Sequence, residues 1–175
     1  MTLIERRRFL VGAAALVSAV AGGAAAKPAP AFALASAVLY QPGEAMLRRG
    51  LPADVLAGYM KSLVAKADEV LGGSPPTAGV SGALVVALKP PARSRLWIMA
   101  GDKAREPELA SLLKGPLESA PSPSVTGFIA FAINFDAWGG GRRLVFPMPI
   151  PDEWRRAMSH SGVLPDDVLK VIWPD

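Results

Sequence analysis

The feature that most constrains the fold is the alternating segment 124–135, SVTGFIAFAINF. Large apolar side chains fall on one face of an extended chain here, and small or polar ones fall on the other. The first face comprises Val125, Ile129, Phe131, Ile133 and Phe135, and the second comprises Thr126, Ala130, Ala132 and Asn134. Because side chains alternate along a strand, this pattern predicts a strand with one face against an apolar core. Other elements must therefore pack on that face.

A long helix and a hairpin are predicted before this strand. After Pro52, apolar residues recur at three- and four-residue steps until Gly72 and Gly73, which is typical of an amphipathic helix and its end. The apolar runs 83–89 and 94–99 are separated by the turn-rich sequence KPPAR, which predicts two short strands joined as a hairpin.

A second helix is predicted to begin at Pro107 and to stop at Gly115 and Pro116, and two short helices are expected at Asp152–Met158 and Asp166–Ile172. The element order is helix, strand, strand, helix, strand and a helical tail. We therefore expect an α+β domain in which a small, three-stranded, mainly antiparallel sheet packs on helices along one face.

The amino-terminal segment 5–26, ERRRFLVGAAALVSAVAGGAAA, sets three arginines against an apolar run. With Arg6, Arg7, Phe9 and Leu10 it resembles twin-arginine export signals, whose core reads R-R-x-F-L. The resemblance implies recognition by the twin-arginine translocase, transport of a folded protein, and a periplasmic or secreted location in a bacterium. One alternative is an uncleaved anchor in the inner membrane, although the many glycines and alanines weaken such a span. The other alternative is an ordinary secretory signal.

Two small-x-small cleavage sites follow, Ala24–Ala26 and Ala31–Ala33. We expect cleavage after Ala33, because KPAP then forms a basic, helix-breaking region before the cut; cleavage after Ala26 is the alternative. The predicted organisation is a signal peptide 1–33, a leader segment 34–50 with a short helix near its end, an α+β domain 51–141, and a proline-rich segment with a helical tail, 142–175, packed on the domain.

The net charge and the absence of cysteine argue against several classes of function. The chain carries a formal net charge of +4, but a cut after Ala33 removes four basic residues and one acidic residue and leaves +1. This balance argues against a nucleic-acid partner. The chain has no cysteine, which excludes disulfides, thiolate metal sites and a cysteine nucleophile. We expect no metal, no cofactor and, after cleavage, no membrane contact.

Two local motifs and the element order resemble the carboxy-terminal domain of TonB-like energy transducers. One motif is Pro123-x-x-x-Gly127 followed by the strand ending at Phe135, and the other is the segment 40–50, YQPGEAMLRRG. The resemblance implies a domain that docks on protein segments by strand pairing, without catalysis. A membrane-anchored TonB-like transducer domain is therefore one functional alternative. Unlike that family, the chain has a helix of about twenty residues between segment 40–50 and the first predicted strand.

Candidate catalytic residues are few. His160 is the only histidine, and it lies between Ser159 and Ser161 in an expected interhelical loop. A small periplasmic hydrolase using this histidine with a neighbouring serine is the enzymatic alternative. However, no G-x-S-x-G elbow presents a serine nucleophile.

Candidate contact residues lie in two places. Arg93, Arg95 and Trp97 alternate along the second predicted strand, and Arg142 with Arg143 follows a run of three glycines. Guanidinium groups and aromatic rings suit an anionic ligand or a protein partner. Our first hypothesis is an exported, non-enzymatic binding or accessory protein that contacts a periplasmic protein through its sheet face or edge.

Overall fold

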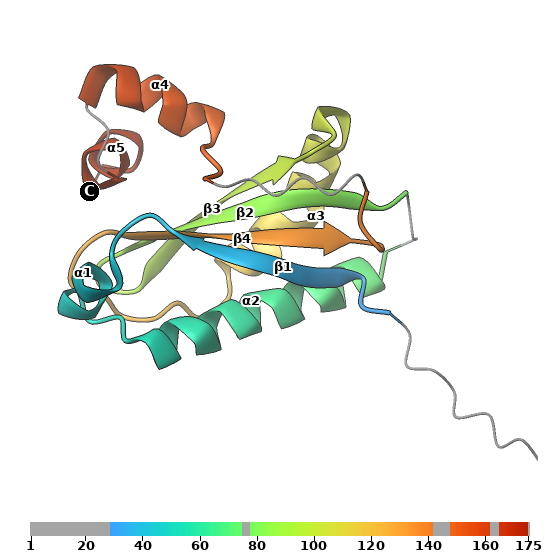
Figure 1. Cartoon of the computed structure of the whole chain (residues 1–175), viewed down its shortest axis with the longest axis horizontal. Helices are drawn as coiled ribbons and strands as arrows, with labels where there is room; N and C mark the ends of the chain where they lie inside the picture. The colour runs from blue at the N-terminus through green and yellow to red at the C-terminus, as the bar shows by residue number, and fades with distance from the viewer. Residues whose placement is uncertain (1–28, 75–77, 142–147, 162–164, 175) are drawn as a thin grey trace, which may run out of the picture.

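The computed structural model describes residues 29–74, 78–141, 148–161 and 165–174, with side chains described except at 159–161 (Figure 1). The elements are β1 (Phe32–Leu39), α1 (Gly43–Arg48), α2 (Ala53–Gly72), β2 (Val80–Lys89), β3 (Arg93–Ala100), the short 3-10 helix η1 (Lys103–Arg105), α3 (Glu106–Glu118), β4 (Ile129–Ala137), α4 (Asp152–Ser161) and α5 (Pro165–Ile172). The four described strands form one antiparallel sheet in the order β1-β4-β2-β3.

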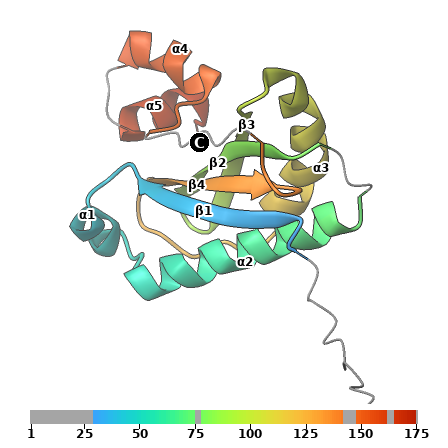
Figure 2. The same ribbon diagram turned by 45° about the vertical axis from the view of Figure 1, so that its right-hand side comes forward.

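Helices cover both faces of the sheet. α2 and α3 pack on one face, and α4 and α5 lie on the opposite side (Figures 1 and 2). The predicted α+β class, the antiparallel sheet on helices and the short C-terminal helices are confirmed. The expected three strands and single covered face were wrong, because an additional strand joins the edge and the tail helices cover the second face.

The connections leave two free edges. β1 and β2 run parallel with β4 between them and are joined through α2, while β3 and β4 run parallel with β2 between them and are joined through α3. Both crossovers run over the same face, so α2 and α3 pack against each other. As a result β1 and β3 form the two edges of the sheet. The element order predicted from the sequence does not indicate which strands lie at the edges.

The strand missed by the sequence analysis is β1, which occupies part of the predicted leader segment and begins within the predicted signal peptide. Its sequence FALASAVL is dominated by small residues, so it lacks the strong alternation of β4. Phe32 anchors it, with 1% of its surface exposed and its ring 4.6 Å from that of Phe135. Phe135 lies against Gly82 of β2, where a Cβ would meet the Phe135 ring at 2.7 Å.

Two predicted boundaries also differ. α3 does not stop at Gly115 but continues through Pro116 to Glu118, because Leu117 extends the buried stripe of Leu109 and Leu113 by one turn. β4 begins at Ile129, five residues later than predicted. The predicted core face is confirmed: Val125, Ile129, Phe131, Ile133 and Phe135 all lie in the cluster under α2 and α3.

The small residues on the other face of β4 allow the tail to pack closely. Ala130 and Ala132, with Ala83, Val85 and Ala87 of β2, form a shallow surface against which Trp154, Val168 and Leu169 of α4 and α5 are buried. An ion pair also holds α5 in place. Asp166 in the first turn of α5 accepts hydrogen bonds from both terminal nitrogens of Arg49. The α4–α5 pair is therefore part of the same packed unit as the sheet.

Alkaline pH is expected to destabilise this packing through the tyrosines. Burial raises the pKa of Tyr59 above its ordinary value of 10.0, with the Ser94 hydroxyl opposing the shift, and burial also raises the pKa of Tyr40. Below pH 10 the native and unfolded chains both keep these protons, so stability is unaffected. Above it the unfolded chain releases them first, so stability falls as pH rises. Urea midpoints at pH 8 and 10.5 should show this loss, and Tyr59→Phe should reduce it. An equal loss in both proteins would contradict the assignment.

Candidate functional site

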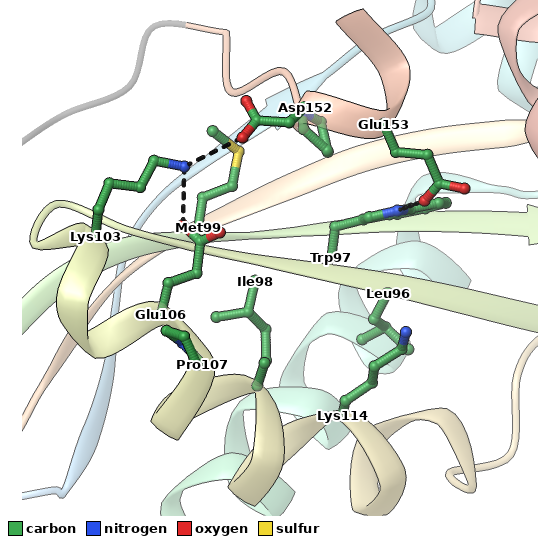
Figure 3. A pocket seen from close by; sticks show the side chains of 12 residues that line it. Leu96, Trp97, Ile98, Met99, Lys103, Glu106, Pro107, Lys114, Asp152 and Glu153 are labelled. Atoms are coloured by element: carbon green, nitrogen blue, oxygen red, sulfur yellow. Dashed lines mark hydrogen bonds and ion pairs between the residues drawn. The ribbon is translucent and has the colours of Figure 1, made fainter. Parts of the chain in front are cut away.

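A groove follows the free edge of β3 between α3 and the start of α4 (Figure 3). Its volume is about 290 Å³. The floor is β3 from Leu96 to Met99, one wall is α3, and the other wall is the turn at Pro151 and Asp152. The groove exists because β3 is an edge strand and because helices from both layers project beyond it.

The backbone of β3 presents alternate residues to the groove. Gly101 donates its N–H to the carbonyl of Ser81 at 2.8 Å, so odd-numbered positions bond to β2 and even-numbered positions face outward. Two of the outward amides are capped by carboxylates from α3. Leu96 donates to Glu118 at 3.0 Å, and Ala100 donates to Glu106 at 3.2 Å.

Ile98 lies between these two capped positions, at the floor of the groove. No side chain in the described part of the protein caps its outward-facing amide. An unpaired strand edge is a template for another strand, and carboxylate caps are one way to limit that pairing. The β3 edge is therefore closed at two positions and open at the one between them.

The walls of the groove are apolar and its rim is charged. Pro107 and Ala110 of α3 and Pro151 before α4 give the groove its apolar lining. At one end, Lys103 bridges Glu106 at 3.1 Å and Asp152 at 3.7 Å, as the dashed lines of Figure 3 mark. This bridge ties the wall formed by α3 to the wall formed by the start of α4.

Lys114 contributes a positive charge to the groove. It projects from α3 beside Leu96 in Figure 3, and it has no hydrogen-bond or ion-pair partner among the described residues. The neighbouring carboxylates are already engaged by backbone amides or cations; they are Glu106, Glu118, Asp152 and Glu153. The groove can therefore offer backbone hydrogen bonds, an apolar lining and one free ammonium group.

The predicted strip on β3 contributes to the attachment of the tail. Arg95 donates to the carbonyl of Ile172 at 2.6 Å and to Glu153 at 2.9 Å. The indole N–H of Trp97 donates to the same Glu153 at 2.6 Å, while the Arg93 guanidinium lies 5.9 Å from the centre of the Trp173 ring. These three residues contact the C-terminal segment that contains α4, α5 and Trp173, and Trp97 also lines the groove.

The other predicted site residues are not brought to the groove by described contacts. The backbone of residues 159–161 lies in the last turn of α4 and not in the expected interhelical loop, and the side chains of Ser159, His160 and Ser161 lie outside the described part. Two further sets of predicted residues lie outside the described part altogether: Arg142 and Arg143, and the signal residues Arg6, Arg7, Phe9 and Leu10.

The described residues contain neither a metal-binding cluster nor a membrane-spanning helix. Within residues 29–74, 78–141, 148–161 and 165–174, no group of three or more histidine, aspartate or glutamate side chains is arranged to hold a metal ion. Over the same ranges, no helix has the length and apolar character needed to cross a membrane.

The groove residues were missed because nothing in their local sequence marks them. Lys103, Glu106, Ala110 and Lys114 read as the solvent-facing positions of an ordinary amphipathic helix and the turn before it. Their role depends on β3 being an edge strand, which follows from strand order. No family model, no curated protein and no solved structure matches the chain, so the site stands on its geometry.

Proposed function

We propose that this protein is an exported, non-enzymatic binding protein that takes a short extended segment of a partner protein into the β3 groove as an added strand. The observation that carries the proposal is the uncapped amide of Ile98 between two carboxylate-capped amides. Strand addition gives affinity through main-chain hydrogen bonds and specificity through pockets for alternate side chains. The resemblance to TonB-like domains implies the same mode of docking.

The length of the groove floor sets the length of the ligand. From Leu96 to Ala100 the strand rises by about 13 Å, since each residue adds about 3.3 Å. A partner segment of about four or five residues fills this length. Ile98 supplies one donor and one acceptor to it, and each net hydrogen bond contributes about 0.5–1.5 kcal/mol. The binding is therefore expected to be weak unless the side chains also fit.

The lining indicates the side chains of that segment. Pro107, Ala110 and Pro151 offer apolar contact to residues that alternate along the added strand. Lys114 favours a carboxylate, either an acidic side chain or the end of a chain. An exposed ion pair contributes only about 0.2–1 kcal/mol to the binding free energy. We therefore expect this lysine to affect the orientation and selectivity of binding more than the affinity. The proposed ligand is a short, mainly apolar, extended peptide with one carboxylate.

Blocking the groove tests the function. Ala110→Trp places an indole in the groove from α3, whereas Ser111→Trp puts the same group on the exposed next position of the helix. Linear seven-residue peptides displayed on phage would be selected on the wild-type protein and then measured on both variants. We expect Ala110→Trp to lower affinity by about tenfold or more, while Ser111→Trp leaves it unchanged. Equal affinities for the two variants would refute binding at this groove.

A further inference from the structure

We propose that the β3 groove recognises an internal segment of its partner that reads apolar-x-acidic, runs antiparallel to β3 and pairs its acidic side chain with Lys114. The apolar side chain lies against Ala110, about one helical turn before Lys114 on α3. This inference rests on the proposed function, strand addition at β3, and specifies the sequence and the direction of the strand that is added.

The first argument is the alignment of α3 with β3. Glu106, at the start of α3, accepts a hydrogen bond from the amide of Ala100 at 3.2 Å. Glu118, at the end of α3, accepts one from the amide of Leu96 at 3.0 Å. The helix therefore runs alongside the strand in the opposite direction. A strand added antiparallel to β3 consequently runs in the same direction as α3.

The second argument is the spacing of residues on the side of α3 that faces the groove. Glu106, Ala110 and Lys114 follow one another at intervals of four residues, and all three line the groove. Four residues of a helix rise by about 6 Å, and two residues of a strand rise by about 6.6 Å. One step along this side of α3 therefore matches one step between alternate residues of an added strand.

The third argument is the face of the added strand that turns towards α3. Leu96 and Ile98 pack with α2 and α3, whereas Trp97 and Met99 pack with α4 and α5. Residues directly opposite each other in a ladder place their side chains on the same face. The ligand residues opposite Ile98 and Leu96 therefore turn towards α3, and the residue between them turns towards the α4 wall.

The direction of the added strand follows from the backbone groups of Ile98. In an antiparallel pair one residue exchanges both bonds with the residue opposite, whereas parallel bonds are slanted and the pairing is slightly less stable. The pairings of β1 to β4 are all antiparallel. A single apolar residue can thus satisfy both groups of Ile98. The ligand residue two positions later then lies opposite Leu96, beside Lys114 (Figure 3).

An acidic side chain fits that position better than the end of a chain. The amide of Leu96 already donates to Glu118, so a chain that ended there would bring its own carboxylate towards the Glu118 carboxylate. An acidic side chain at the same position points instead towards α3. Lys114 has no hydrogen-bond or ion-pair partner among the described residues, so its ammonium group is available to that side chain.

Four peptides test the sequence and its direction, each as a competitor of a fluorescein-labelled peptide selected by phage display as above. Three are acetylated and amidated. TTVLVET carries the proposed order, TEVLVTT has the same composition in reverse, and TTVLVKT carries lysine in place of the acid. The fourth, acetylated TTVLVT with a free carboxyl group, places a chain end opposite Leu96. We expect TTVLVET to bind about twofold to fivefold more tightly than each of the others, the factor for one exposed ion pair.

The other results overturn the inference in different ways. Tightest binding of TEVLVTT would show a parallel strand, and tightest binding of TTVLVT would show capture of a chain end. Equal binding of all four would remove the role of the acidic side chain. In each case peptide binding at the groove, and with it the proposed function, is retained. Failure of the wild-type protein to bind any peptide, phage-selected ones included, would refute the proposed function itself.

Charge-reversal variants test whether the preference comes from Lys114. Lys114→Glu should reverse it, so that TTVLVKT binds more tightly than TTVLVET, and Lys114→Gln should abolish it. Lys61→Glu is the matched control, because it makes the same change of charge at an exposed position of α2 that does not line the groove. It should keep the wild-type preference. The same change of preference in Lys114→Glu and Lys61→Glu would assign the effect to net charge and overturn the inference.

Discussion

Replacing Phe32 with alanine is expected to lower the free energy of unfolding by about 3–5 kcal/mol, the cost of truncating a large buried aromatic side chain. The ring is fully enclosed by Phe135, α2 and the sheet, so its removal leaves a cavity at one end of the core. Gly82 opposite Phe135 cannot fill that cavity, and a Cβ added there would meet the carbonyl oxygen of Met99 at 2.3 Å.

The matched control lies on the same strand. Leu34 is 49% exposed, so Leu34→Ala removes a large apolar side chain from the same strand without opening a cavity. Its cost is expected to be below about 1 kcal/mol. Urea denaturation followed by tryptophan fluorescence measures both variants. If Phe32→Ala costs no more than Leu34→Ala, then β1 does not contribute to the stability of the domain.

The second large effect is expected at Arg49, which connects three segments of the chain. Its two terminal nitrogens donate to the two oxygens of Asp166, each at 2.8 Å, and one of them also donates to the carbonyl of Phe128. Its own carbonyl accepts from the amide of Thr126 at 2.9 Å. The pair is about one-third exposed, so we expect Arg49→Ala to cost about 2–3 kcal/mol, less than a fully buried pair.

Arg48 provides the control for Arg49. It is the preceding residue, is 72% exposed, and pairs with Glu44 at 3.8 Å within one helix. Arg48→Ala should change the free energy of unfolding by less than about 0.5 kcal/mol. Arg49→Lys should fall between the two, because an ammonium group cannot bond both carboxylate oxygens in the same geometry. Equal costs at Arg48 and Arg49 would show that the link to α5 does not contribute to stability.

Much of the fold follows from hydrophobic periodicity. The alternation at Ile129, Phe131 and Ile133 predicts β4 and its buried face, and the three- and four-residue spacing after Pro52 predicts α2. In both cases the buried side is formed by large side chains, so the pattern is strong. β1 has only Phe32 as a large buried residue. Its other positions include three alanines and a serine, so its sequence shows no clear alternation of apolar and polar residues.

The candidate site was less predictable, for a physical reason. An edge strand is defined by what does not pair with it, and this depends on the order of all four strands. Arg95 and Trp97 were selected because basic and aromatic side chains suit a ligand, but their groups bond to Glu153 and to the backbone of α5. The same chemistry recognises a partner or a segment of the same chain, and sequence alone does not distinguish them.

The two edges of the sheet differ in how many of their outward-facing amides are capped by carboxylates. On β3, Glu118 and Glu106 cap the amides on either side of Ile98, which restricts pairing to one position inside a walled groove. On β1, Asp68 caps the amide of Phe32. Carboxylates from the helices thus cap two outward-facing amides of β3 and the first one of β1, and such caps limit unspecific strand pairing at those positions. The open position on β3 is where we place binding.

The most direct test of that placement is amide hydrogen exchange at Ile98, measured by NMR on the full chain with and without a peptide selected as above. The Trp97 amide is the internal reference, because it faces β2. We predict that the peptide slows exchange at Ile98 by about tenfold or more and leaves Trp97 little changed. Unchanged exchange at Ile98 under saturating peptide would contradict strand addition at the β3 edge.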